Sequence, residues 1–251
     1  MPRSIAWLAI GVVAAAGAVA AQPLSRLKGR IVSESGAAIE ADVRIEAVLG
    51  PRGDSYVGQR IYTVRSNAKG EWTLIGFKAG AWMFAVAPET QLIDAVVLPI
   101  NVFVPAGSGM AGLGPSWRPV LKPAPVPAGA AGDWLTIAAA AARQGDSARA
   151  SETLSVVPPE AGAPALAAAG RIGLWLHDPG LARTLFTRAL ALDPASFRAT
   201  LGFGSAALML GDFSAASKAF KAARDLTHDS DERSYLTAAI ADLSRMDISG
   251  H

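Results

Sequence analysis

An internal repeat with a period of 34 residues constrains the C-terminal half of this chain more than any other feature. Four residues recur 34 positions later in one register and without a gap, which pairs Gly170 with Gly204, Ala182 with Ala216, Phe186 with Phe220, and Ala189 with Ala223. This period accommodates two antiparallel helices and their turns. The small residues fit where two helices of a hairpin approach closely, and the phenylalanine fits between successive hairpins. The repeat therefore predicts a stack of helical hairpins.

These positions resemble the tetratricopeptide repeat. That family has a small residue at the eighth position, alanine at the twentieth, an aromatic residue at the twenty-fourth, alanine at the twenty-seventh and proline at the thirty-second. A unit that starts at Ala163 has Gly170, Ala182, Phe186, Ala189 and Pro194 there. The resemblance divides residues 131–251 into units at about 131–162, 163–196 and 197–230, with an end helix over 230–246 that solvates the array.

The resemblance also implies a peptide-binding surface, because the first helix of each hairpin lines a groove in this family. The groove positions fall on Arg143, Arg171, Trp175, Arg198, Leu201, Ser205 and Met209. Such a mixture suits an extended or helical peptide, with arginines pairing its carboxylates. The alternative for Trp175 and Met209 is burial against the next hairpin, because an apolar stripe at helical spacing usually faces a core.

Residues 22–104 have a period near two, which indicates strands rather than helices. Glycine turns around Gly36, Gly70 and Gly80 separate short runs of alternating apolar residues. About six or seven such strands predict a small antiparallel β-sandwich.

This N-terminal region resembles a carboxypeptidase regulatory-like domain, which is a non-catalytic β-sandwich related in fold to carbohydrate-binding modules. The resemblance rests on Gly29-Arg30-Ile31-Val32, Val43-Arg44-Ile45, Gly70-Glu71-Trp72 and Gly80-Ala81-Trp82. It suggests that Trp72 and Trp82 stack on sugars. The alternative is that both indoles are core residues, as is usual for large aromatics in a small sandwich.

The two regions are joined by residues 105–130, which have no apolar period. Pro105 to Gly129 contains six prolines and five glycines. Proline lacks the N–H that a sheet ladder needs, and it keeps the preceding residue extended. We therefore predict a semi-rigid linker.

Residues 1–21 read as a secretory signal peptide. Arg3 precedes an apolar and small run from Ile5 to Ala21, and a small-residue pattern predicts cleavage after Ala20 or Ala21. The alternative, an uncleaved membrane anchor, is disfavoured because the run is shorter than the roughly 20 strongly apolar residues of a span. We expect an exported protein, periplasmic or secreted, that meets the membrane only through this segment if it is uncleaved.

Charge and residue types exclude several classes of function. Removal of the signal peptide takes away Arg3 and leaves 22 of the 23 basic residues with 21 acidic ones. The net charge is then close to zero, so the composition shows no nucleic-acid footprint. The chain has no cysteine, which excludes thiol nucleophiles and thiolate metal sites. Its three histidines, His177, His228 and His251, do not form a zinc-protease pattern, and no nucleophile-elbow pattern occurs. We therefore expect no catalytic residues, no metal site and no cofactor.

Together these features predict a multidomain chain, with an N-terminal all-β sandwich and a C-terminal all-α tetratricopeptide-like helical repeat array. The function that this arrangement favours is an exported, non-enzymatic adaptor or scaffold that binds a protein or peptide of the cell envelope. The alternative is a carbohydrate-binding envelope protein in which the β-sandwich holds a glycan and the repeats serve assembly.

Overall fold

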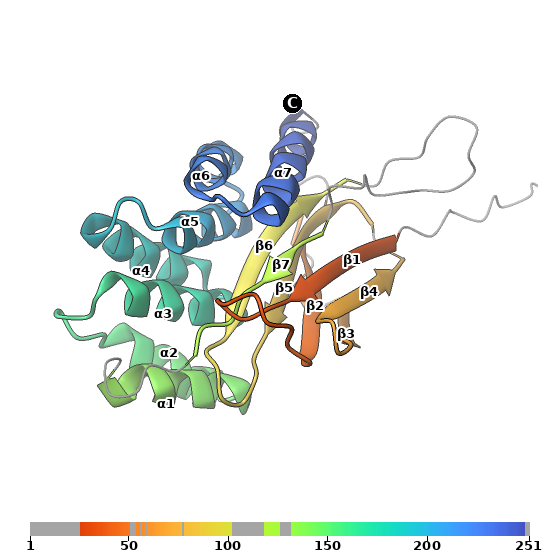
Figure 1. Ribbon diagram of the computed structural model, residues 1–251. Coiled ribbons are helices and arrows are strands. Elements are labelled where there is room, and N and C mark those ends of the chain that lie inside the picture. Colours follow the sequence, from red (N-terminus) through yellow and green to blue (C-terminus); the bar gives the residue numbers. More distant parts are fainter. Residues whose placement is uncertain are drawn as a thin grey trace, which may run out of the picture.

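The computed structural model describes residues 26–50, 54–55, 57–58, 60–76, 78–101, 118–125 and 132–248. It confirms the predicted fold class, with a β region first in the chain and a helical array after it. Figure 1 shows the helices gathered on one side of the strands. The predicted signal peptide, residues 1–21, lies outside the described residues.

The β region consists of two sheets. The four-stranded sheet is antiparallel, in the order β3 (Ile61–Arg65), β2 (Asp42–Leu49), β5 (Gly80–Val86) and β6 (Asp94–Ile100). In the three-stranded sheet, β1 (Arg26–Ile31) lies between β4 (Glu71–Ile75), which is antiparallel to it, and β7 (Val120–Leu121), which is parallel to it.

Strand β7 lies within the segment that composition predicted as a linker. The Arg30 N–H donates to the Pro119 carbonyl at 3.0 Å, and the Val32 N–H donates to the Leu121 carbonyl at 3.0 Å. A proline carbonyl accepts a hydrogen bond like any other, so the prolines here flank a short strand instead of preventing one. The rest of the predicted linker, residues 105–117 and 126–130, is outside the described part of the chain.

Aromatic side chains fill the space between the two sheets. Trp72 of β4 stacks on Phe84 of β5 with ring centroids 5.8 Å apart, and Trp82 lies 6.1 Å from Tyr62. Trp72 and Trp82 are only 2% and 1% exposed. Neither indole therefore presents a face for a sugar, and of the two interpretations of these tryptophans the structure supports the core one.

Seven helices follow in the described part of the chain: α1 (Gly132–Arg143), α2 (Ser147–Ser155), α3 (Ala163–Trp175), α4 (Pro179–Leu192), α5 (Phe197–Met209), α6 (Phe213–Leu226) and α7 (Ser230–Ile248). Asp146, Asp178, Ser196 and Asp212 cap four of them, each accepting a backbone N–H in the first turn. None of the helices described is both long and apolar enough to cross a lipid bilayer.

The repeat positions have the packing roles that the period predicted. Phe186 of α4 is fully buried between Gly170 of its own hairpin and Gly202 of the next. A Cβ at these glycines would come within 2.7 Å and 2.2 Å of the Phe186 ring, respectively. Glycine is therefore required at both positions for the helices to pack at this distance.

Gly202→Ala is expected to lower the free energy of unfolding by about 1–2 kcal/mol. Overpacking a core costs about 1–3 kcal/mol, which exceeds the gain of up to about 1 kcal/mol from replacing a helical glycine. Denaturant unfolding measures the difference. The control is Gly180→Ala in α4, where the nearest atom to the new Cβ is Asp178 Oδ1 at 3.6 Å. A Gly202 variant as stable as this control would contradict the packing account.

Candidate functional site: the first-helix face

The predicted groove residues all come from the first helices of the hairpins. We call the surface of α1, α3, α5 and α7 that is turned toward the β region the first-helix face. Strand β6 packs against α3, α5 and α7 there. Figure 1 shows β6 as the strand beside these helices. The face that would line a peptide groove is therefore largely covered by an edge strand of the same chain.

Ser205 of α5 makes the most direct contact with this edge. Its Oγ accepts a hydrogen bond from the Val97 N–H at 3.0 Å and lies 3.3 Å from the Val97 carbonyl oxygen, to which it donates. Ser205 is fully buried. One hydroxyl thus satisfies both backbone groups of a residue that has no neighbouring strand on that side.

Asp242 of α7 closes the end of the same edge. Its Oδ2 accepts the Asn101 N–H at 2.9 Å, and its backbone carbonyl accepts the Asn101 side-chain amide at 2.8 Å. Pro99 lies between the two contacts, at a position whose nitrogen points away from β5. A proline there costs no ladder bond, which is where edge strands tolerate it.

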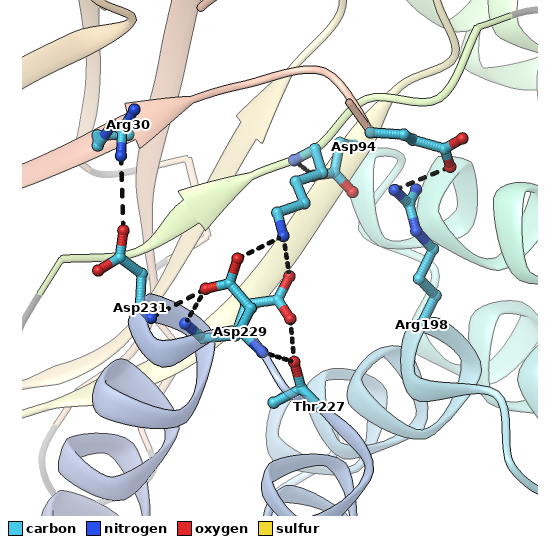
Figure 2. A network of polar contacts seen from close by, with 9 residues as sticks. Arg30, Asp94, Arg198, Thr227, Asp229 and Asp231 are labelled. Atoms are coloured by element: carbon cyan, nitrogen blue, oxygen red, sulfur yellow. Dashed lines mark hydrogen bonds and ion pairs between the residues drawn. The ribbon is translucent and has the colours of Figure 1, made fainter. Parts of the chain in front are cut away.

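A polar network extends these contacts along the seam between β7 and α7, and Figure 2 shows it. Lys122 Nζ pairs with Glu232 at 2.8 Å and with Asp229 at 3.1 Å, and its N–H donates to Asp94 at 2.6 Å. Thr227 donates to Glu232. Partial burial opposes the charge on Lys122, but the two carboxylates raise its pKa above the ordinary value. Lys122 therefore stays charged and holds the start of α7 against the β region.

Arginines from the first helices pair with the β region instead of projecting into an open groove. Arg171 is 5% exposed, and its Nε lies 3.3 Å from Asp94 Oδ1. Burial lowers the pKa of Arg171 to about 10, and Asp94 opposes that shift. Arg198 pairs with Glu34 at 3.1 Å. Figure 2 labels Arg198 and marks this ion pair with a dashed line. Arg143 donates to the Gln91 carbonyl at 2.5 Å.

The apolar residues among the predicted groove positions, Trp175, Leu201 and Met209, lie either at the contact with the β region or against the hydrophobic core. Trp175 lies under Arg44 of β2, whose guanidinium carbon is 5.0 Å from the ring centroid. Leu201 lines a small cavity beside β6, and Met209 is half-buried against the hydrophobic core. These side chains are thus partly buried by neighbouring residues, because the first-helix face is itself packed against a sheet.

A second cluster, centred on Glu46 of β2, lies at the end of α3. Glu46 is fully buried, and its carboxylate contacts Arg44 at 2.7 Å, His177 Nε2 at 3.1 Å and the Gly58 N–H at 3.0 Å. Burial alone would raise the pKa of Glu46. The bonds from His177 and Gly58, together with the charges of His177 and Arg44, instead lower it to about 2.

His177 reaches Glu46 from a left-handed backbone position. The helices α1 and α5 are each followed by a glycine at positive φ, Gly145 and Gly211. At the corresponding position after α3 the residue is His177, which also has a positive φ, of 59°. Asp178 N–H donates to the Gly173 carbonyl and His177 N–H to that of Leu174, which completes a Schellman end. A non-glycine residue in this conformation costs roughly 1–2 kcal/mol. The contact with Glu46 offsets this cost and explains why a histidine replaces glycine in this unit.

Part of the first-helix face is not covered by β6. A cavity of about 440 Å³ lies between the beginnings of α3 and α5, α1, and loops of the β region. Its walls are mostly apolar and include Leu135, Pro164, Ala165 and Ala168. Arg171 and Arg198 line it as well, each already paired with a carboxylate of the β region, Asp94 and Glu34. The cavity thus combines an apolar wall with two cationic groups.

The family comparison agrees with this geometry. A family model described as tetratricopeptide repeat matches residues 176–240. This match supports tetratricopeptide repeats in the helical array. Such repeats are non-catalytic protein-interaction modules. The carboxypeptidase regulatory-like resemblance of the β region stays a prediction.

Several solved structures of tetratricopeptide domains are similar to this chain. The Arabidopsis OM64 domain is 18% identical, with a TM-score of 0.37, over 43% of this chain and 93% of that chain. The first such domain of human RPAP3 is 16% identical, with a TM-score of 0.41, over 48% of this chain and 97% of that chain. PcrH, in complex with the chaperone binding region of PopD, is 16% identical, with a TM-score of 0.38, over 47% and 92%. A search of curated proteins found no match.

Sequence reasoning missed the partners that the β region supplies to the repeat array. Asp94, Glu46 and Lys122 are isolated polar residues with no pattern that marks them as contacts. One signal was present: the strand DAVVLPI is apolar at consecutive positions, and such runs indicate burial on both faces. For β6 this burial is between the other sheet and the helices.

Glu46→Gln is expected to remove part of the acid sensitivity of the protein. Because the folded-state pKa lies below the ordinary value of 4.5, Glu46 stabilises the fold above about pH 4.5, and this contribution fades as the pH falls toward 2. A shift of this size corresponds to about 3 kcal/mol. Unfolding free energies at pH 7, 5 and 3 should show Glu46→Gln less stable than wild type at pH 7, with the gap closing on acidification.

The matched control is Glu152→Gln on the exposed side of α2. It should follow the wild-type pH dependence. A Glu46 variant with a pH dependence parallel to wild type would show that the Glu46 cluster does not stabilise the seam.

Proposed function

We propose that this protein is an exported, non-enzymatic adaptor that binds a protein partner through its tetratricopeptide repeats, at the cavity left open on the first-helix face. The carrying observation is that cavity, with its apolar wall and its two arginines. The N-terminal apolar run and its small-residue pattern support export to the periplasm or beyond.

The dimensions and chemistry of the cavity favour a short segment of a protein chain. Its volume of about 440 Å³ lies within the range of specific ligand sites. The alanines at its wall leave room for side chains of a partner, and Leu135 and Pro164 offer apolar contact. Arg198 is about a quarter exposed, so it remains accessible to a partner carboxylate despite its pairing with Glu34.

The location of the cavity also fits an adaptor. The β region fixes α3 and α5 by contacts with β6, so the two walls that these helices form are held in place before a partner arrives. Preorganisation of this kind reduces the ordering cost of binding. Of the predicted groove residues, Arg198 therefore bears on partner binding, whereas Arg171 and Ser205 act within the chain.

Selection from a displayed peptide library tests the proposal. The library should yield ligands with small or apolar side chains and a carboxylate, with affinity measured by fluorescence anisotropy. Ala165→Phe fills the cavity and should weaken these ligands at least tenfold, which is about the loss of one buried apolar contact. The control Ala148→Phe is on the exposed face of α2 and should bind like wild type.

Selected peptides that bind Ala165→Phe as tightly as the control would place the interaction elsewhere and contradict the proposal. A library that yields no ligand would do the same. Circular dichroism of both variants verifies that the helical array is retained.

A further inference from the structure

The outward side of β1 carries a row of cations. The strand alternates, with Arg26 and Lys28 exposed and Arg30 half-exposed, while Leu27 and Ile31 are buried in the sandwich. In register with them on β4 lie Ile75, Thr73 and Glu71. Figure 1 shows β1 and β4 on the side of the β region that is away from α1 to α6. This basic row is therefore separate from the cavity of the first-helix face, and its Arg30 end reaches α7 through Asp231.

A broad cleft of about 480 Å³ brings further cations to this row. Its lining contains five basic residues, Arg26, Lys28, Arg30, Arg65 and Arg118, but a single carboxylate, that of Glu71. We call this surface the basic cleft. The near-neutral charge of the whole chain conceals it, because the compensating acids lie elsewhere.

Two of the five cations are paired and three are not. Arg30 lies 3.6 Å from Asp231, and Arg65 lies 3.3 Å from Asp42. Arg26, Lys28 and Arg118 form no ion pair within the described part of the chain. Glu71, the acid of the cleft, is 3.4 Å from the Asn67 side-chain amide. Three uncompensated charges on one open surface attract a polyanionic partner.

One further feature points to a phosphate-rich, partly apolar surface as that partner. Ile75, opposite Arg26, is 54% exposed. A cationic surface with an exposed aliphatic side chain at its border suits a lipid bilayer, where headgroup phosphates meet acyl chains.

The position of the cleft in the chain agrees with this assignment. The apolar run of residues 5–21 ends four residues before Arg26, the first residue of β1. Five extended steps span at most about 18 Å, so the basic cleft lies close to wherever that run ends. In the uncleaved form, this run and the basic cleft supply two membrane signals close together, whereas in the chain from Gln22 onward the basic cleft acts alone.

We propose that the basic cleft docks the folded protein on a bilayer that contains anionic phospholipids. The cations contact headgroup phosphates, and Ile75 faces the interface. Docking here leaves the cavity of the first-helix face on another side of the molecule, so it is independent of partner binding there.

Vesicle co-sedimentation tests the proposal with the chain from Gln22 onward, because every described strand and helix lies within residues 26–248. The probes are vesicles of phosphatidylcholine alone and of phosphatidylcholine with 30% phosphatidylglycerol. The test variant is Arg26→Glu/Lys28→Glu/Arg118→Glu. The control, Arg149→Glu/Lys218→Glu/Lys221→Glu, makes the same change in net charge on exposed helical positions. Circular dichroism and thermal unfolding verify that both are folded.

Wild type and control should bind the anionic vesicles, and the cleft variant should bind at least tenfold more weakly. Binding should fall as salt is raised from about 0.1 M to 0.5 M, since the screening length shrinks over that range. The proposal is overturned if wild type does not bind anionic vesicles or binds phosphatidylcholine equally. Equal effects of the two variants would also overturn it, as would wild-type binding to soluble polyphosphate without binding to vesicles.

Discussion

The hydroxyl of Ser205 and the carboxylate of Asp242 hold the outer edge of β6, and the arrangement of the whole molecule depends on this contact. An edge strand presents unpaired N–H and carbonyl groups, which invite pairing with another chain. Here α5 and α7 satisfy those groups with side chains at Val97 and Asn101. The helical array thereby protects the sheet, and the sheet fixes the first helices in one orientation.

This contact changes what the repeat array offers to a partner. In an isolated array the first helices would expose a continuous surface. In this protein β6 covers much of it, and salt bridges at Asp94, Glu34 and the Lys122 network close the seam. What remains is a bounded cavity lined by both halves of the chain. Together with the basic cleft on the far sheet, it suggests an adaptor with one side for a membrane surface and another for a protein.

Short-range sequence patterns predicted the helices and most strands. They did not predict the contacts between residues that are far apart in the sequence. The register that pairs Gly170 with Gly204 and Phe186 with Phe220 predicted the hairpins because each of those residues has a short-range packing role. Alternation predicted most strands for the same reason. The docking of β6 rests on Ser205, whose helical position is compatible with either a groove or a buried seam. Nothing in one sequence distinguishes these two. Strand β7 and the left-handed His177 were missed because each is determined by a distant partner, β1 and Glu46.

Hydrogen exchange at the Val97 amide tests the central claim most directly. If Ser205 covers the β6 edge, this amide should exchange as slowly as the Ala206 amide inside α5, through global unfolding. In Ser205→Ala its exchange should accelerate while that of Ala206 follows only the loss of global stability, expected to be about 1–3 kcal/mol for a buried group left unpaired. Fast exchange of Val97 in the wild-type protein, or no selective acceleration in the variant, would show that the helices do not protect this edge.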